Sequence, residues 1–337
     1  MPGEMKADSA LTAPRIEPPA EAPFAGHVPA TMAVVSGPAA WDGLLPDAAP
    51  SLAEARRYCE RLVRTHYENF PVATFLLPKD LRPHFYSVYA YCRWADDLGD
   101  ETGDPARSLW LLDRWEEELQ ACYRGEARHP VFVALADTVK QRDIPIGPFL
   151  DLIAAFRLDQ AKTRYQNFDE VLEYCRYSAN PVGRLVLYVC GYRDPELQQL
   201  SDFTCTALQV ANFWQDVRRD YAIGRIYMPL DEMNRYGYTE ADLRAMRCNQ
   251  NFAALLRHLV ERTWELFRRG LPLVHRVDRR LAVDIELFSR GGMEILRLIE
   301  RQNYDVLSRR PHLEKSQMLM LGASVVAGQL WPRRWRS

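Results

Sequence analysis

Residues 195–221 read PELQQLSDFTCTALQVANFWQDVRRDY, a stretch without glycine in which proline occurs only at the first position. Asp194 precedes it as a preferred N-cap residue, and Pro195 is tolerated because it falls in the first helical turn. Gly224 follows where a residue of left-handed conformation commonly ends a helix. The stretch therefore predicts a single helix of about 40 Å.

Helix signals recur on both sides of this segment. Ser51 and Glu54 form a capping-box pattern, and Asp104 with Gly125 marks the two ends of a second helix. Alternating β patterns bounded by turn residues are almost absent. The sequence therefore predicts an all-α fold, with one domain of long helices over 51–330. The further predicted helices span 51–70, 82–97, 105–124, 129–141, 148–165, 169–191, 251–270 and 278–309.

The two ends of the chain differ from this domain. Residues 1–50 are rich in Pro and Ala and lack a helical apolar period, so we expect a disordered leader. Near the other end, the apolar stretch 318–331 precedes a basic tail, 331–337. This stretch is too short to span a bilayer. Contact with lipid headgroups is one interpretation, and a helix docked on the core is the favoured one.

Composition limits the classes of function. Of 337 residues, 47% are hydrophobic and 26% charged, and 43 basic against 45 acidic residues give a net charge of −2. This balance is typical of a globular protein and offers no bulk attraction for nucleic acid. The seven cysteines form no CxxC pair, and the N-terminal sequence shows no secretory signal. We therefore expect a cytoplasmic protein without a disulfide framework or a structural zinc site.

Two segments, WADDLGD (94–100) and WQDVRRD (214–220), share the spacing of a tryptophan and two aspartates. Residues four apart lie on one face of a helix. Asp96 and Asp100 therefore form a first acidic row. Asp216 and Asp220 form a second acidic row, which Asn212 extends by one turn.

The acidic rows point to a divalent cation. Acids on one helix face repel each other by a few tenths of a kcal/mol, and a bound cation reverses that sign. Carboxylate and amide oxygens suit Mg²⁺. No His or Cys lies in register with either row, which argues against zinc. A single row would indicate a solvated helix face. Because both rows lie among aromatic and apolar residues, they favour a metal cluster at the mouth of a cavity.

Arginines and aromatic residues accompany the rows. Arg93 and Arg225 are candidates to bind a phosphate group, although each taken alone is better explained as a surface ion-pair partner. Aromatic residues such as Phe213 on the same helices are candidates to line an apolar cavity and to stabilise a cation through their rings.

Four ordered motifs carry a resemblance to a known family. They are NFPVATFLLP (69–78), VYAYCRWADDLGDE (88–101), YCRYSANPVGRLVL (174–187) and LQVANFWQDVRRDYAIGRIYMP (208–229). Together they resemble the squalene/phytoene synthases, the head-to-head isoprenyl synthases, over about positions 51–310. The resemblance implies an isoprenoid-synthase-type helical bundle with a central apolar cavity.

The resemblance also implies roles for individual residues. It implies Mg²⁺ bound by both acidic rows, and it places Tyr89 and Arg93, with Arg225, at the substrate diphosphate. Within the motifs we expect four residues to line the substrate pocket. These are Phe70, Val182, Gln209 and Phe213.

The NFPVA and SANPVG segments are most similar to the hydroxysqualene synthases of the bacterial hopanoid pathway. The expected reaction is therefore conversion of presqualene diphosphate and water to hydroxysqualene and diphosphate. NADPH is not expected, since no GxGxxG follows a strand. A head-to-head prenyltransferase is one alternative, and a non-catalytic helical binding protein of the same fold is another. A peripheral contact with the inner membrane or with downstream hopanoid enzymes also stays open.

Overall fold

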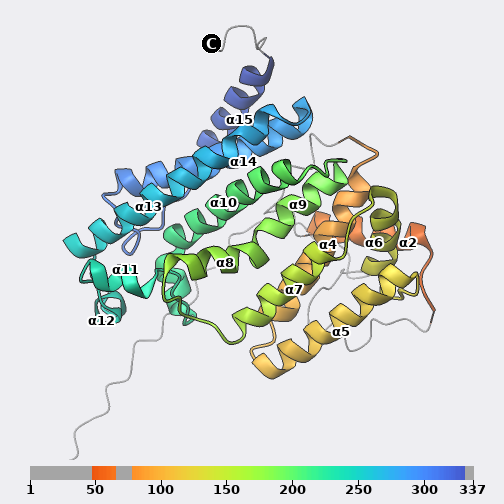
Figure 1. The fold of residues 1–337 in the computed structure, drawn as a ribbon, viewed down its shortest axis with the longest axis horizontal. Helices are drawn as coiled ribbons and strands as arrows, with labels where there is room; N and C mark the ends of the chain where they lie inside the picture. Colours follow the sequence, from red (N-terminus) through yellow and green to blue (C-terminus); the bar gives the residue numbers. More distant parts are fainter. Residues whose placement is uncertain (1–47, 66–77, 331–337) are drawn as a thin grey trace, which may run out of the picture. The chain divides into compact units, whose positions relative to one another are not determined.

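A computed structural model describes residues 48–65 and 78–330 and is all-α (Figure 1). Within these residues no β-strand forms, and the one extended pairing is an isolated bridge between Arg164 and Ile226. The predicted fold class is therefore correct. The predicted leader, the basic tail and Phe70 lie outside the described residues, so these predictions stay untested.

The first group of helices packs around buried aromatic rings. Trp94 and Trp115 stack with their ring centroids 5.6 Å apart, and Tyr91 stacks on Trp115 at 5.7 Å. His129 lies against both tryptophans, and burial lowers its pKa to about 3. A neutral His129 therefore belongs to the core. The helices of this group are α2 (Leu52–Thr65), α4 (Arg82–Asp100), α5 (Pro105–Arg124), α6 (Pro130–Arg142) and α7 (Gly147–Asp159).

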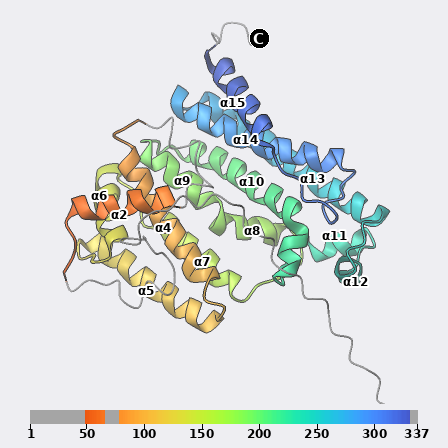
Figure 2. The ribbon, with the colours of Figure 1, turned by 180° about the vertical axis from the view of Figure 1, so that it is seen from behind.

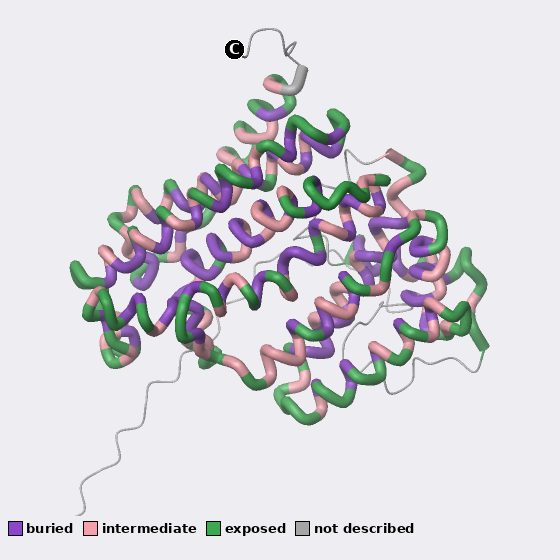
Figure 3. Tube along the Cα trace, in the orientation of Figure 1, coloured by how far each residue is buried: buried purple, intermediate pink, exposed green. Residues whose placement is uncertain are grey.

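The second group surrounds α10 (Pro195–Ala222), the long helix predicted from the sequence. This helix packs against α8, α9, α13 and α14, and the burial pattern along its length follows these contacts (Figures 2 and 3). The other elements are α8 (Phe168–Ser178), α9 (Asn180–Val189), α11 (Leu230–Arg235), α12 (Glu240–Arg244), α13 (Gln250–Gly270), η2 (Leu271–His275), α14 (Arg279–Arg301) and α15 (Lys315–Leu330).

The helix-end signals that the sequence predicted are confirmed. Ser51 and Glu54 exchange hydrogen bonds at the start of α2, with Ser51 Oγ donating to Glu54 Oε2 at 2.6 Å. Asp104 and Asp194 each accept a backbone N–H two residues later, at 2.9 and 2.8 Å. Gly125 ends α5 with φ of 79°. Local chemistry therefore determines where these helices begin and end.

Three predicted helices were too long. The helix predicted over 148–165 ends at Asp159, and the one predicted over 169–191 breaks at Ala179, just before the Asn-Pro pair that opens α9. The helix predicted over 278–309 ends at Arg301, because Asn303 and Tyr304 adopt left-handed conformations with φ of 51° and 65°. The breaks after α7 and α14 bring the following segments to the chain near the acidic rows, where Ile226 bonds Thr163 and Arg310 bonds Asp216.

The described part of the chain contains no helix that combines the length and the hydropathy needed to cross a membrane. All seven cysteines lie in this part, and each is a free thiol.

Candidate active site

The first acidic row lies on the last two turns of α4. Burial and the neighbouring charge of Asp100 raise the pKa of Asp96 to about 6. Arg93, three residues before Asp96, pairs with the carboxylates of Asp96 at 3.5 Å, of Asp97 and of Glu101 at 3.4 Å. The structure therefore places Arg93 beside the row, where neighbouring acids hold its guanidinium.

Tyr89 lies one helical turn before Arg93 on α4. Burial raises the pKa of Tyr89, while the charge of Arg93 acts in the opposite direction. Tyr89 therefore lies within electrostatic reach of the arginine with which the sequence analysis grouped it.

The second acidic row lies near the C-terminal end of α10. Burial, followed by the charge of Asp216, raises the pKa of Asp220 to about 7. Asn212 lies one helical turn before Asp216 and is exposed. Each row thus concentrates negative charge in a partly desolvated place, which is the electrostatic condition that a bound cation relieves.

Arg225 reaches the first row from the end of α10. Gly224, with φ of 84°, turns the chain back, so that the Arg225 N–H donates to the Asp220 carbonyl at 2.8 Å. The next residue, Ile226, donates its N–H to the Thr163 carbonyl at 2.9 Å. The Arg225 guanidinium then donates to Asp100 Oδ1 at 3.2 Å. A glycine turn and a short backbone pairing therefore place Arg225 between the rows.

Asp159, the last residue of α7, is a site residue that sequence analysis missed. Tyr174 donates a hydrogen bond to Asp159 Oδ2 at 2.8 Å, while the buried Oδ1 accepts none from the described residues. Burial raises the pKa of Asp159 to about 6, with Arg225 opposing the shift and Asp100 adding to it. Asp159 therefore lies beside the first row. Its position at the end of one more apolar helix gave no signal of this proximity.

Arg310 is a second residue that sequence analysis missed. Its guanidinium binds Asp216 with two hydrogen bonds, Nε to Oδ1 at 2.5 Å and Nη2 to Oδ2 at 2.8 Å. The left-handed residues after α14 return the chain to α10, where Gln215 also donates to the Pro311 carbonyl at 2.6 Å. Arg310 therefore neutralises the second row, as Arg225 does for the first.

The donors suit a hard divalent cation, because both rows offer only oxygen atoms and Asp159 Oδ1 is buried without a hydrogen bond from the part of the chain that the structure describes. Within the described residues, however, no three Asp, Glu, His or Cys side chains form a group able to hold one ion. Asp100 and Asp216 are instead paired with arginines. The metal cluster thus fits in donor chemistry and stays a prediction.

A cavity of about 210 Å³ with almost entirely apolar walls lies among α4, α9, α10, η2 and α14. Val182, expected to line the substrate pocket, lies in its wall. On α4 the lining residue Phe85 precedes Asp96, and on α10 Leu208 precedes Asp216. These separations of 11 and 8 residues correspond to about 16 and 12 Å along the helices. Both helices therefore run from the cavity to the acids.

Asp284 is the one carboxylic acid among the described residues that line this cavity. Burial and the charge of Asp278 raise the pKa of Asp284 to about 7. Near neutral pH this side chain therefore holds a proton in a large fraction of molecules, so the cavity wall carries less negative charge than an ordinary aspartate would give it.

The remaining predicted pocket residues have different positions. Phe213 is buried and stacks on Tyr227, with ring centroids 3.7 Å apart, and it shares a small cavity with Asp220 and Arg225. Phe213 thus lies next to the acids. Gln209 is half-buried on α10 and is not among the described residues that line either cavity.

Comparison with known proteins places this arrangement in a family. The family model described as squalene/phytoene synthase matches residues 63–317, most of the chain. The chain belongs to the squalene/phytoene synthase family. Members of this family are isoprenoid synthases that act on prenyl diphosphates, so the chain belongs to an enzyme family.

Individual members of the squalene/phytoene synthase family are similar over most of their length. A hydroxysqualene synthase of Rhodopseudomonas palustris is 35% identical, covering 79% of this chain and 91% of the relative. A phytoene synthase of Arthrospira platensis is 31% identical over 80% and 91% of the two chains. The crystal structure of squalene synthase HpnC from Alicyclobacillus acidocaldarius is 48% identical, with a TM-score of 0.72, over 75% of this chain and 95% of that chain.

Proposed function

We propose that the protein is a Mg²⁺-dependent hydroxysqualene synthase, which converts presqualene diphosphate and water to hydroxysqualene and diphosphate. The observation that carries the proposal is the convergence of the acidic rows near Arg225, at one end of two helices whose other end borders an apolar cavity. The similarity to a hydroxysqualene synthase and to squalene synthase HpnC supports this choice within the family.

In this proposal the charged residues act on the leaving group. Magnesium ions between the acidic rows would supply positive charge to the departing diphosphate. Arg225 and Arg93 already lie at the rows and offer N–H groups to phosphate oxygens once their carboxylate partners turn to the metal. Tyr89, next to Arg93, extends the same side of α4. These groups stabilise negative charge as the C–O bond breaks.

The apolar residues act on the hydrocarbon. Once diphosphate leaves, the substrate is a carbocation that any nearby nucleophile would capture. The cavity walls are almost entirely apolar, and the raised pKa of Asp284, the one carboxylic acid among the described lining residues, lowers the negative charge that this side chain carries. Aromatic faces such as the Phe213–Tyr227 stack stabilise positive charge without reacting with it. The proposed reaction ends when one water attacks the rearranged cation and loses a proton.

A head-to-head prenyltransferase is the second candidate. It is favoured by the similarity to the phytoene synthase of Arthrospira platensis. That activity would use the same acidic rows and would differ in the hydrocarbon pocket. It joins two prenyl diphosphates, so it would accumulate presqualene diphosphate or phytoene rather than an alcohol.

The proposal includes the place of action. Substrate and product are hydrocarbon-rich molecules of low water solubility, so we place the enzyme in the cytoplasm with peripheral contact to the inner membrane. Downstream hopanoid enzymes are its proposed neighbours there, and NADPH is not required.

The test is to incubate the purified protein with presqualene diphosphate and Mg²⁺ in H₂¹⁸O, with and without NADPH. The expected product is a linear C30 alcohol that carries the label, in an amount that NADPH leaves unchanged. Squalene formed only with NADPH would contradict water capture. Presqualene diphosphate or phytoene formed from simpler prenyl diphosphates would instead support the transferase.

A further inference from the structure

Helix α15 presents an uncharged apolar surface to solvent. From Ser316 to Leu330 it contains no charged residue. Leu319 and Met320 are 75% and 66% exposed, and Met318 and Val326 are 46% and 41% exposed. An exposed helix face normally carries charged side chains, because apolar area in water is unfavourable. The exposed apolar outer face of α15 is therefore expected to contact another apolar surface.

The inner face of α15 is already used. Val325 is fully buried and Leu321 half-buried, and the helix packs on α14 (Figure 1). The remaining apolar residues project on the other sides, so contact with α14 does not account for them. A helix of 16 residues is about 24 Å long, shorter than a membrane-spanning helix. What covers α15 must therefore lie along it.

Charge indicates what kind of surface this is. From Lys315 to Ser337 the sequence holds four basic residues and no acidic one, and tryptophans stand at 331 and 335. Basic residues favour anionic headgroups, and tryptophan favours the boundary between headgroup and hydrocarbon. Two copies of the chain meeting through α15 would bring these basic segments together without an acid on the helix to offset them.

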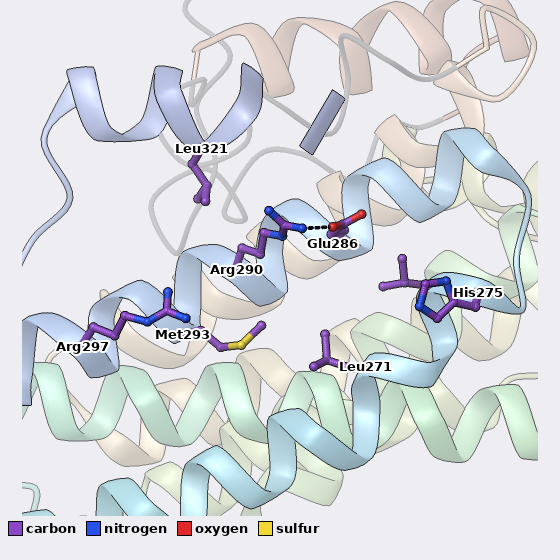
Figure 4. Close-up of a pocket in the computed structure, with 8 residues that line it drawn as sticks. Leu271, His275, Glu286, Arg290, Met293, Arg297 and Leu321 are labelled. Atoms are coloured by element: carbon purple, nitrogen blue, oxygen red, sulfur yellow. Dashed lines mark hydrogen bonds and ion pairs between the residues drawn. The ribbon is translucent and has the colours of Figure 1, made fainter. Parts of the chain in front are cut away.

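A groove beside α15 combines apolar side chains with arginine–glutamate pairs, and Glu286 is among its lining residues. A cavity of about 410 Å³ opens between α14, η2 and α15, with Leu271, Met293 and Leu321 as apolar lining (Figure 4). Arg290 and Arg297 of α14 line it as well, and each is paired with a glutamate of its own helix. Apolar area next to arginines therefore extends from α15 onto its neighbour.

We propose that the outer face of α15, with the adjoining groove, docks on the surface of an anionic lipid bilayer. The helix would lie in the plane of the interface, with Leu319 and Met320 among the acyl chains and Lys315, at its start, at the headgroups. This surface is separate from the acidic rows. The inference rests on the peripheral membrane contact proposed above, for which it names the surface, and it does not depend on the proposed reaction.

The test uses the full chain without substrate, so its outcome does not depend on which reaction the enzyme performs. Sedimentation with vesicles is measured for phosphatidylcholine alone and for mixtures containing about one third phosphatidylglycerol. We expect binding to the anionic vesicles that weakens as salt rises. The double variant L319E/M320E should bind roughly tenfold or more weakly, since two apolar side chains no longer enter the bilayer.

The matched control is L109E/W110E on α5, where the side chains are 39% and 45% exposed. Helix α5 lies far from α15 in both views (Figures 1 and 2). The control variant should bind vesicles like the wild type, and both variants should keep wild-type helical content and thermal stability. Equal loss in both variants, or no wild-type binding to anionic vesicles, overturns the proposal. A wild-type dimer that L319E/M320E converts to a monomer, or vesicle binding gained only when residues 1–47 are deleted, assigns the face to a second copy or to the leader and also overturns it.

Discussion

Arg225 Nη2 lies 3.2 Å from Asp100 Oδ1, although 125 positions separate the two residues in the sequence. This ion pair joins the end of α4 to the segment that follows α10. Burial opposes the charge of Arg225, but Tyr227, Asp159 and Asp100 raise its pKa overall. Arg225 therefore stays charged and holds the two acidic helices in a fixed relation.

Replacing Arg225 by Met should reduce turnover by about 10²-fold, because one preorganised positive charge would be lost at the leaving group. Release of diphosphate under saturating substrate measures this effect. The control is Arg268→Met on α13, where an exposed arginine pairs with its neighbour Glu265. Similar turnover in the two variants would show that Arg225 has a purely structural role.

The acidic rows should act as a unit. Asp96→Asn and Asp216→Asn are each expected to lower turnover by on the order of 10²-fold or more, and the double variant should be little worse than either one, because both rows serve one cation-binding arrangement. Helical content by circular dichroism should not change. Glu117→Gln, on the exposed side of α5, provides the control. Near-normal turnover in both single variants would remove the metal-cluster prediction.

The stability of the metal-free protein should depend on the protonation of Asp220. Its pKa is raised from 3.8 to about 7 in the folded state, so the folded protein holds a proton that the unfolded chain releases between these values. Folding stability contributed by this proton is present at low pH and is lost as pH rises toward 7. The melting temperature of the wild type relative to Asp220→Asn should therefore fall between about pH 4 and pH 7 and change little above that. A difference that is independent of pH would contradict the raised pKa.

Arg310 should compete with a cation for Asp216. Its guanidinium makes two hydrogen bonds to this carboxylate, and both side chains are partly exposed, so Arg310→Met should destabilise the metal-free protein by about 1 kcal/mol. MgCl₂ should raise the melting temperature of the variant more than that of the wild type, because Asp216 is then free to bind. An equal increase in both proteins would show that Arg310 does not limit access to the row.

Gly183 should be required for the close packing of α9 on α10. A Cβ at this position would lie 2.3 Å from Ser201 Oγ and 2.5 Å from Cys205 Sγ. Gly183→Ala is therefore expected to cost about 1–3 kcal/mol of unfolding free energy. Gly291→Ala on α14 meets no atom within 4 Å and should stabilise by about 0.5–1 kcal/mol. Chemical denaturation distinguishes the two, and equal effects would contradict the packing argument.

The elements that depend on near neighbours in the chain were predictable from the sequence. Helix starts at Asp104 and Asp194 were correct because an N-cap bonds an N–H two or three residues away. The acidic rows could be recognised for the same reason, since helix geometry alone places Asp96 with Asp100. The family resemblance rested on motifs of this kind, and the match over residues 63–317 confirms it.

The contacts that neutralise the rows depended on tertiary structure. Arg310 binds Asp216 across 94 positions only because Asn303 and Tyr304 end α14 and turn the chain back, a break that helical periodicity did not reveal. Asp159 joins the site because α7 ends at this residue, and the chain just beyond it forms a backbone hydrogen bond with the residue that follows Arg225. Sequence periodicity reports which residues share one helix face. Which faces meet is decided by how the helices pack, because the stabilising contacts link distant segments and leave no repeating pattern in either one.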